Sequence, residues 1–187
     1  MATTTNFSVD GFTSSLKHGG ARTNLMLVEL TSPSGGIKAK TFTYMCKASN
    51  IPGSTLTPIE VPYFGRNVKL AGESREFAPL TTTVVNDEGR EIYVGMVAWM
   101  KDLNDPAGNV AKKKLFESRK DYCADIKLEM FTKAGETDQI WKFINCWPSN
   151  MSAIDLNWDS VNTIQEFTID WQYDYYLHDK ANISDGR

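Results

Sequence analysis

The chain has 187 residues, of which 41% are hydrophobic and 23% are charged. This length suits one domain with or without extended arms, and this composition can bury a core, which excludes an intrinsically disordered protein. The net charge of −3 is uneven, because residues 148–187 carry seven acids against two bases. An acidic region argues against binding nucleic acid, which needs Lys and Arg for phosphate. No apolar run approaches the roughly 20 residues of a membrane span.

Residues 1–22 are rich in Thr, Ser and Gly, with a short apolar island formed by Val9, Phe12 and Leu16. Phe12 and Leu16 are four residues apart, which predicts one or two helical turns that end at the following pair of glycines. We interpret this segment as an arm that docks on another surface. It lacks a basic patch followed by an apolar core, so we expect no secretory signal and synthesis in the cytoplasm.

Two strands are expected next, at residues 24–31 and 40–48, joined by a Ser/Pro/Gly turn. In the second, Phe42, Tyr44 and Cys46 share one parity. The two segments therefore predict a hairpin.

The segment from Lys47 to Gly72 is extended but apolar. Its three prolines fix their own φ and push the preceding residue towards extended geometry, which excludes a helix throughout and a central strand in the first half. Long uncommitted loops are uncommon and tend to be functional. We therefore predict that another copy of the protein orders this loop. The residues assigned to that inter-subunit contact are Ile51, Pro52, Leu56, Pro58, Ile59, Val61, Pro62, Tyr63 and Phe64.

Strand character resumes over residues 63–70 and 80–85. Asn86 or Asp87 then offers an N-cap for a helix over 88–103, expected to be largely buried, with Ile92, Met96, Trp99 and Leu103 at helical spacing. Residues 121–131 and 139–147 predict a second hairpin. A crossing loop over 148–158 follows, with Met151, Ile154 and Leu156 as anchors.

The last strand has the clearest period-two pattern of the chain. One face carries Phe167, Ile169, Trp171, Tyr173 and Tyr175, and the other is polar. This pattern is typical of a half-buried antiparallel strand. The fold class expected from all elements is mainly β: an antiparallel β-sandwich or barrel with one packed α-helix, an extended N-terminal arm and an extended loop. The predicted organisation is an arm at 1–22, one domain at 23–177 containing the loop 48–62, and a polar tail at 178–187.

Glu166, Asp170 and Asp174 recur every four residues on the polar face of that last strand. Their spacing of about 13 Å exceeds the roughly 5–10 Å of a glycosidase carboxylate pair. The simplest interpretation is a solvated face. A second interpretation is the lining of a channel, where like charge would repel DNA.

Nothing in the sequence supports catalysis or a cofactor. The common nucleophile, phosphate-binding and zinc-protease motifs are missing, and neither His has a Ser or Cys partner. Cys46, Cys123 and Cys146 each lie in an apolar run, which favours reduced, buried thiols over a metal site. The run Lys112-Lys113-Lys114 is interpreted as a solvated loop, with contact to an acidic neighbour as the alternative.

Residues 51–72, IPGSTLTPIEVPYFGRNVKLAG, resemble the long loop of the tail tube proteins of contractile-tailed bacteriophages. In that family a segment of the form IPG…IEVPYFGR-VKLAG is characteristic. Residues 6–31 resemble the family's N-terminal arm and first strand, and residues 146–176 resemble its ending. The resemblance covers residues 6–177, and the stretch 105–122 departs most from it.

The resemblance implies a virion protein that forms hexameric rings, stacked into a hollow tube inside a contractile sheath. Genome DNA would pass through the lumen without specific binding. Sheath, tape-measure, baseplate and terminator proteins are the implied partners. It also implies that the loop contributes to contacts between rings, and that Glu166, Asp170 and Asp174 face the lumen.

Two alternatives remain open. One is the tube protein of a related machine, such as a type VI secretion system or an extracellular contractile particle. The other is a monomeric β-sandwich binding module, for example for carbohydrate, whose five Trp residues could stack on sugars. That module predicts a stable monomer with the apolar loop folded on its own body.

Overall fold

The computed structural model describes residues 8–16, 19–31, 37–111 and 117–180. Besides a short 3₁₀ turn at Arg119–Asp121, the elements in chain order are α1 (Val9–Ser15), β1 (Met26–Thr31), α2 (Ala39–Met45), β2 (Cys46–Ser49), β3 (Ser54–Leu56), β4 (Ile59–Tyr63), β5 (Arg66–Leu70), β6 (Arg75–Phe77), β7 (Leu80–Val85), α3 (Glu91–Leu103), β8 (Ala124–Phe131), β9 (Thr137–Met151), β10 (Glu166–Gln172) and β11 (Tyr175–Lys180).

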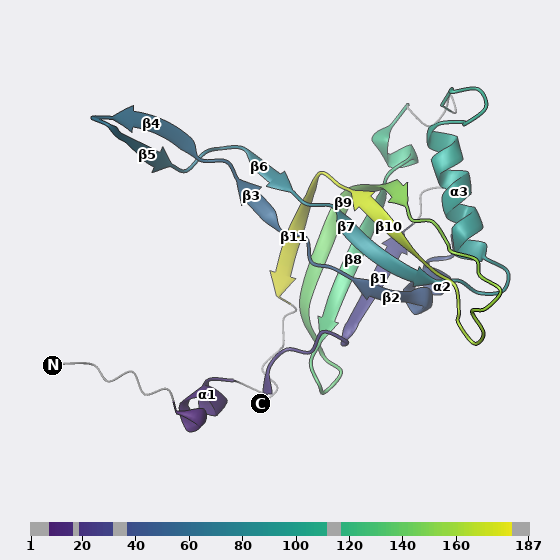
Figure 1. The fold of residues 1–187 in the computed structure, drawn as a ribbon, viewed down its shortest axis with the longest axis horizontal. Helices are drawn as coiled ribbons and strands as arrows, with labels where there is room; N and C mark the ends of the chain where they lie inside the picture. The colour runs from purple at the N-terminus through teal and green to yellow at the C-terminus, as the bar shows by residue number, and fades with distance from the viewer. Residues whose placement is uncertain (1–7, 17–18, 32–36, 112–116, 181–187) are drawn as a thin grey trace.

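One curved antiparallel sheet forms the body of the molecule (Figure 1). Its strand order is β1-β8-β9-β10-β7-β2, and β11 also pairs with β9. The long strand β9 is shared, because β10 pairs with its C-terminal part and β11 with its N-terminal part. The mainly β, antiparallel class predicted from the sequence is confirmed.

The core lies between the sheet and helices α2 and α3, where the predicted alternation of β10 places its apolar face. Phe167, Ile169 and Trp171 are fully buried. The Trp171 ring lies against Trp99 of α3 at 5.7 Å and Phe42 of α2 at 6.3 Å, between ring centroids. Its indole N–H donates to the Thr82 hydroxyl at 2.9 Å. Trp171 thus ties both helices to the middle of the sheet.

The expected hairpin of residues 24–31 with 40–48 is wrong. Residues 39–45 form the helix α2, β2 pairs with β7, and β1 pairs with β8. The alternation of Phe42 and Tyr44 misled the prediction, because only Phe42 is buried while Tyr44 is exposed. Packing of Phe42 on Trp171 decides the local structure in place of β propensity.

The helix expected over 88–103 is present but begins at Glu91. Arg90 precedes it in the left-handed region, at φ 51°, and an Asp87 carboxylate oxygen accepts from the Glu91 amide at 3.1 Å. Ile92, Met96 and Trp99 are buried, whereas Val94 and Val97 are exposed. The prediction of a largely buried helix is therefore wrong: α3 packs through one face only.

Strands β9 and β11 both depart from simple alternation. Asn145 has a φ of 57° and shifts the register, so that Phe143 and Cys146 are both buried. A break after Gln172 likewise brings Tyr176, not Tyr175, against the core. Residues 178–180 were predicted to belong to a polar tail, but they lie in β11, and the His178 ring stacks on Trp141 at 4.7 Å. The rest of that predicted tail lies outside the described residues.

Candidate assembly interface

The segment 50–78 projects from the sheet as a two-part ribbon (Figure 1). Strands β3 and β6 pair first, and β4 and β5 then form a terminal hairpin. The single strand predicted over 63–70 is wrong, because Phe64 and Gly65 form a two-residue turn between β4 and β5. Both turn residues have positive φ, as the tight hairpin turn with matching twist requires.

The β4–β5 hairpin is amphipathic. Ile59 lies opposite Leu70, and Val61 lies opposite Val68. These two cross-strand pairs form an apolar stripe, yet all four side chains are exposed. The other face carries the Glu60–Lys69 ion pair at 3.7 Å. Isolated two-stranded hairpins are marginal in water, so the bare stripe indicates a surface that another molecule covers.

Phe64 occupies the tip of the hairpin and is 92% exposed. Its φ of 43° is unusual for a bulky residue and costs of order 1–3 kcal/mol. Its ring contacts Tyr63 edge-on, with centroids 4.7 Å apart. A large apolar side chain held in a strained, exposed position indicates a functional role rather than a contribution to this subunit's own core.

The base of the ribbon packs against the sheet. Phe77 contacts Tyr173 and Tyr176, and the Tyr173 hydroxyl donates to the Ala78 carbonyl at 2.7 Å. Burial raises the pKa of Tyr173 to about 12, so this hydroxyl keeps its proton. Of the nine predicted loop residues, only Pro52 is buried. The other eight are exposed along the ribbon, which is the placement that a contact with another subunit needs.

The N-terminal arm presents a second unpartnered apolar surface. Helix α1 has Ser8 as its N-cap, whose hydroxyl accepts from the Gly11 amide, and none of its residues is buried. Val9, Phe12 and Leu16 are all exposed. The predicted helical turns are confirmed, and Figure 1 shows α1 lying away from the sheet.

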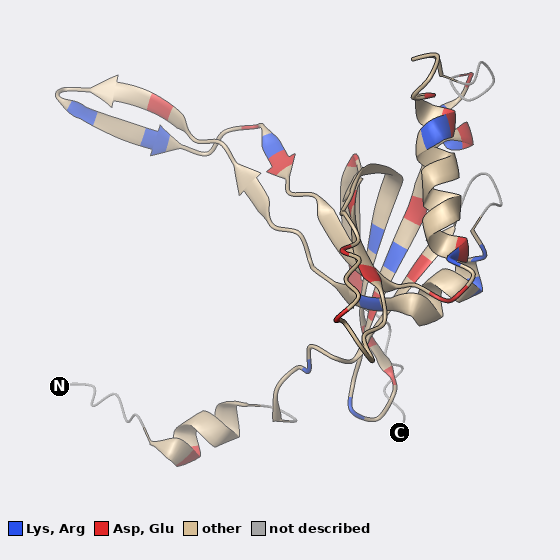
Figure 2. Ribbon diagram, turned by 45° about the vertical axis from the view of Figure 1, so that its right-hand side comes forward, with Lys and Arg blue, Asp and Glu red and all other residues tan. Residues whose placement is uncertain are grey.

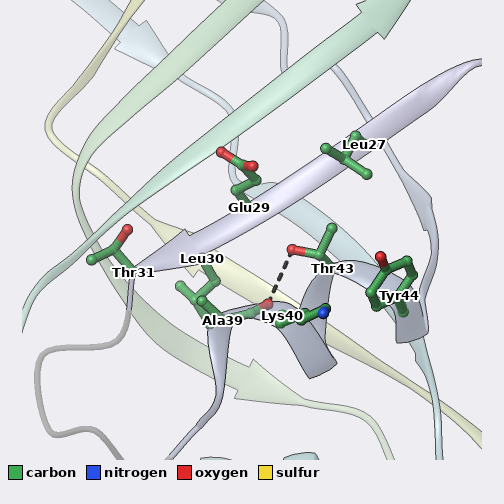
Figure 3. Close-up of a pocket in the computed structure, with 8 residues that line it drawn as sticks. All are labelled: Leu27, Glu29, Leu30, Thr31, Ala39, Lys40, Thr43 and Tyr44. Atoms are coloured by element: carbon green, nitrogen blue, oxygen red, sulfur yellow. Dashed lines mark hydrogen bonds between the residues drawn. The ribbon is translucent and has the colours of Figure 1, made fainter.

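A groove lies between the edge strand β1 and helix α2, with a volume of about 480 Å³ (Figure 3). Leu27, Glu29 and Thr31 line it from β1, and Lys40, Thr43 and Tyr44 line it from α2. The Thr43 hydroxyl donates to the Ala39 carbonyl of its own helix at 3.0 Å. The groove holds no nucleophile–base pair, so it suits contact rather than chemistry.

Each of the three predicted lumen-facing acids has polar partners, but they do not share one strand: Glu166 and Asp170 lie on β10, whereas Asp174 lies in the break between β10 and β11. Glu166 forms an ion pair with Lys47 at 2.5 Å, and Asp174 forms one with Arg119 at 2.8 Å. Asp170 accepts from the Thr81 hydroxyl at 2.8 Å and the Asn150 amide at 3.0 Å. Two of the three charges are therefore compensated, so a repulsive row of carboxylates would depend mainly on Asp170.

Hydrogen bonds lower the pKa of two of these acids. Asn150 and Thr81 lower the pKa of Asp170, and Asn145, followed by Arg119, lowers that of Asp174. Burial acts in the opposite direction at both groups. The hydrogen bonds therefore stabilise the charged carboxylate form of both residues.

Protonation of Asp170 is expected to destabilise the fold. Because its folded pKa lies below 3.8, the carboxylate contributes stability above that value, and the contribution is lost as pH falls through the lower folded pKa. We expect urea unfolding to show that Asp170→Asn is less stable than the unmodified chain at pH 7, and that the difference shrinks as the pH falls below 3.8. A difference that does not change with pH would contradict this role.

The loop from 152 to 165 is a surface that sequence reasoning missed. Leu156 was predicted to anchor it, but Leu156, Trp158, Val161 and Ile164 are all exposed, and only Met151 and Ile154 pack against the core. The prediction of Leu156 as an anchor is wrong. The Asn, Asp and Ser residues between these apolar positions were an available signal of an exposed, turning segment.

The remaining chemistry of the described residues is limited. No group of three or more His, Cys, Asp or Glu within them is arranged to hold a metal ion, and none of their helices is long and apolar enough to span a membrane. Cys46, Cys123 and Cys146 are free thiols. Burial raises the pKa of the Cys46 thiol to about 12, which makes it a poor nucleophile. The lysine run at 112–114 lies outside the described residues.

A sheet with unpaired edges and a projecting apolar hairpin is typical of a self-assembling structural subunit. Residues 2–179 match the model of the phage tail tube protein family, and the chain belongs to that family. It is 30% identical over 174 residues to tail tube protein gp19 of Enterobacteria phage T4, covering 90% of this chain and 98% of the relative. It is 25% identical to the tail tube protein of Serratia phage KSP90, covering 93% and 98%.

Solved structures support the fold. The chain resembles a subunit of the sheath–tube complex of an extracellular contractile injection system, PVC, in its extended state, with a TM-score of 0.63, 14% identity and coverage of 90% and 98%. It also resembles a subunit of the tube-terminating cap of the anti-feeding prophage, with a TM-score of 0.60, 16% identity and coverage of 86% and 91%.

Proposed function

We propose that this chain is the subunit of the inner tube of a contractile phage tail, built from stacked hexameric rings that conduct genome DNA. Membership of the tail tube family supports the tube, and the projecting apolar hairpin supports assembly through contacts with other copies. The hairpin is the observation that carries the proposal, because an apolar stripe held away from its own body has no use in a monomer.

Neighbours within a ring would pair through sheet edges. In the described part of the chain, β1 and β2 end the strand order of the sheet and each offers an edge without a partner strand. Unpaired edges invite addition of another strand, and closing them into a ring removes the hazard of uncontrolled aggregation. The groove beside β1 adds apolar surface to the same edge.

Contacts between rings would use the hairpin and the N-terminal arm. Three prolines restrict the ribbon before assembly, so little conformational entropy is left to lose on docking. Such ring-to-ring contacts are heterologous and do not close on themselves, so the stack grows as a filament. The length must then be set by other proteins, and we assign this role to a tape-measure protein, with a baseplate that nucleates growth and a terminator that ends it.

The tube would lie inside a sheath in the virion tail, after synthesis and assembly in the host cytoplasm. DNA would pass the lumen without specific binding, with the outer face of β10 as the candidate lining. Thr81, Thr168, Asn150 and Asp170 make that face polar, with Asp170 carrying its uncompensated charge. The role is structural, with neither catalysis nor a cofactor.

The tube of a related contractile injection machine is the second candidate, and the fold shared with the PVC sheath–tube complex supports it. Higher sequence identity to the phage relatives favours the phage tail. A monomeric binding module is disfavoured, because it predicts the loop packed on its own domain, whereas the ribbon projects from it (Figure 1).

Negative-stain electron microscopy of the purified chain, alone and with a baseplate nucleus, tests the proposal. We expect hollow rods or rings with a central hole, in which the six-fold symmetry can be counted. Light scattering over a concentration series should show growth with concentration. A persistent monomer in the presence of the nucleus would overturn the proposal in favour of a binding module.

A further inference from the structure

The loop 152–165 carries an apolar surface, here named the distal patch and formed by Leu156, Trp158, Val161 and Ile164. The Trp158 side chain is fully exposed, at 101%. The four residues lie within one short loop, unlike singly scattered surface residues, which need no explanation. The clustering indicates a contact surface whose occupant is absent from the single chain.

The distal patch and the β4–β5 hairpin lie at opposite ends of the molecule. Figure 1 shows the hairpin at one end of the longest axis and the β9–β10 loop at the other, beside α3. One chain therefore cannot bring its own hairpin onto its own patch. Two copies placed head to tail can, and the same contact then repeats along a stack.

The charges of the two surfaces are complementary. Arg66 directly follows the turn of the hairpin and forms no ion pair within the described residues, whereas Lys69 is already paired with Glu60. Asp155 and Asp159 lie within the patch loop, whose residues 152–165 carry no base. Figure 2 shows the basic residues along β5 of the hairpin. A basic, aromatic tip thus matches an acidic, apolar patch.

A buried polar group beside the patch lacks a partner. Asn86 is 7% exposed, and neither its amide nitrogen nor its side-chain oxygen has a hydrogen-bond partner. It lines a hollow of about 260 Å³ together with Ile164, Gln165 and Arg90. An orphaned buried amide is costly and calls for an explanation.

From these observations we infer that the tip of the β4–β5 hairpin of one copy docks on the distal patch of the next copy. Phe64 and Tyr63 pack against Trp158 and its apolar neighbours, and Arg66 faces Asp155 and Asp159. The inference rests on the proposed function for its stacked setting. It adds the surface that receives the hairpin, and it explains why a strained Phe64 is held at full exposure.

Complementation between two full-length variants tests the docking. Phe64→Asp blocks the tip and leaves the turn intact, because Asp-Gly suits a turn with positive φ at both positions. Trp158→Asp blocks the patch, and its exposure means that the core is unaffected. For each variant alone, the dissociation constant for self-association should be at least about tenfold higher than for the unmodified chain. In the mixture, the intact tip of the Trp158→Asp variant can dock on the intact patch of the Phe64→Asp variant. Sedimentation should therefore show a complex with twice the mass of either variant alone. This complex cannot grow further, because its free tip and its free patch are the mutated ones.

Val110→Asp is the matched control, because Val110 is exposed and apolar but lies in the loop after α3. It should associate like the unmodified chain. A mixture that sediments as its separate components, or a Trp158→Asp variant that elongates normally, would overturn the docking while leaving the tube proposal intact. If the mixture forms the complex but the unmodified chain forms no tubes, the docking stands and the tube proposal is overturned.

Discussion

Replacing Ile59 and Val61 together by Asp is expected to abolish tube formation while the chain stays folded and soluble. Both residues lie on the exposed apolar stripe of the hairpin, opposite Leu70 and Val68, and neither contributes to the core. Two carboxylates on this stripe would have to be desolvated without partners when a second copy covers it, which costs several kcal/mol at each contact. Electron microscopy would count tubes, and thermal unfolding would show an unchanged midpoint.

The opposite face of the same hairpin supplies the control. Glu60 and Lys69 form an exposed ion pair there, and such pairs contribute about 0–1 kcal/mol. Replacing both by Ala changes the same two strands without touching the stripe, so tubes should still form. Normal tubes from the Ile59/Val61 variant would show that the stripe is not an assembly surface.

Trp171→Ala is expected to be the most destabilising single substitution, by about 3–5 kcal/mol. The ring is completely buried between Phe42 and Trp99, so truncation leaves a cavity where both helices meet the sheet. The Thr82 hydroxyl, also buried, would lose its donor. Urea unfolding followed by circular dichroism would measure the change.

Trp158→Ala is the matched comparison, because the same truncation occurs at a fully exposed site. Surface changes of this kind usually alter the free energy of unfolding by less than about 0.5 kcal/mol. If the inferred docking holds, this variant assembles less well with other copies but keeps its free energy of unfolding. A core substitution such as Trp171→Ala instead lowers the free energy of unfolding. Equal destabilisation by both substitutions would contradict the assignment of Trp171 as buried and Trp158 as exposed.

Period-two patterns were reliable where a strand is buried on one face. Phe167, Ile169 and Trp171 of β10 are buried on one face, as predicted. The same pattern failed over residues 40–48, because a short alternating segment also fits a helix when only one residue must be buried. It also failed past Gln172, where the break between β10 and β11 reverses the parity.

The candidate interface was predicted in part. Prolines and apolar residues marked the segment 51–64 as extended and unsuited to its own core, and the structure exposes eight of the nine residues assigned to it. The turn at Phe64 was missed, because it requires positive φ from a residue that rarely adopts it. The distal patch was missed, because apolar spacing in a loop cannot distinguish an anchor from an exposed contact.

The amino-acid sequence by itself determined the β class, the extended character of the ribbon and the resemblance to tail tube proteins. These depend on local constraints: proline geometry, alternation along strands and a characteristic run of residues. Only the tertiary structure decided which strands pair, which residues compensate Glu166 and Asp174, and which apolar side chains remain exposed. Those outcomes depend on contacts between segments far apart in the chain, and local pattern carries no information about them.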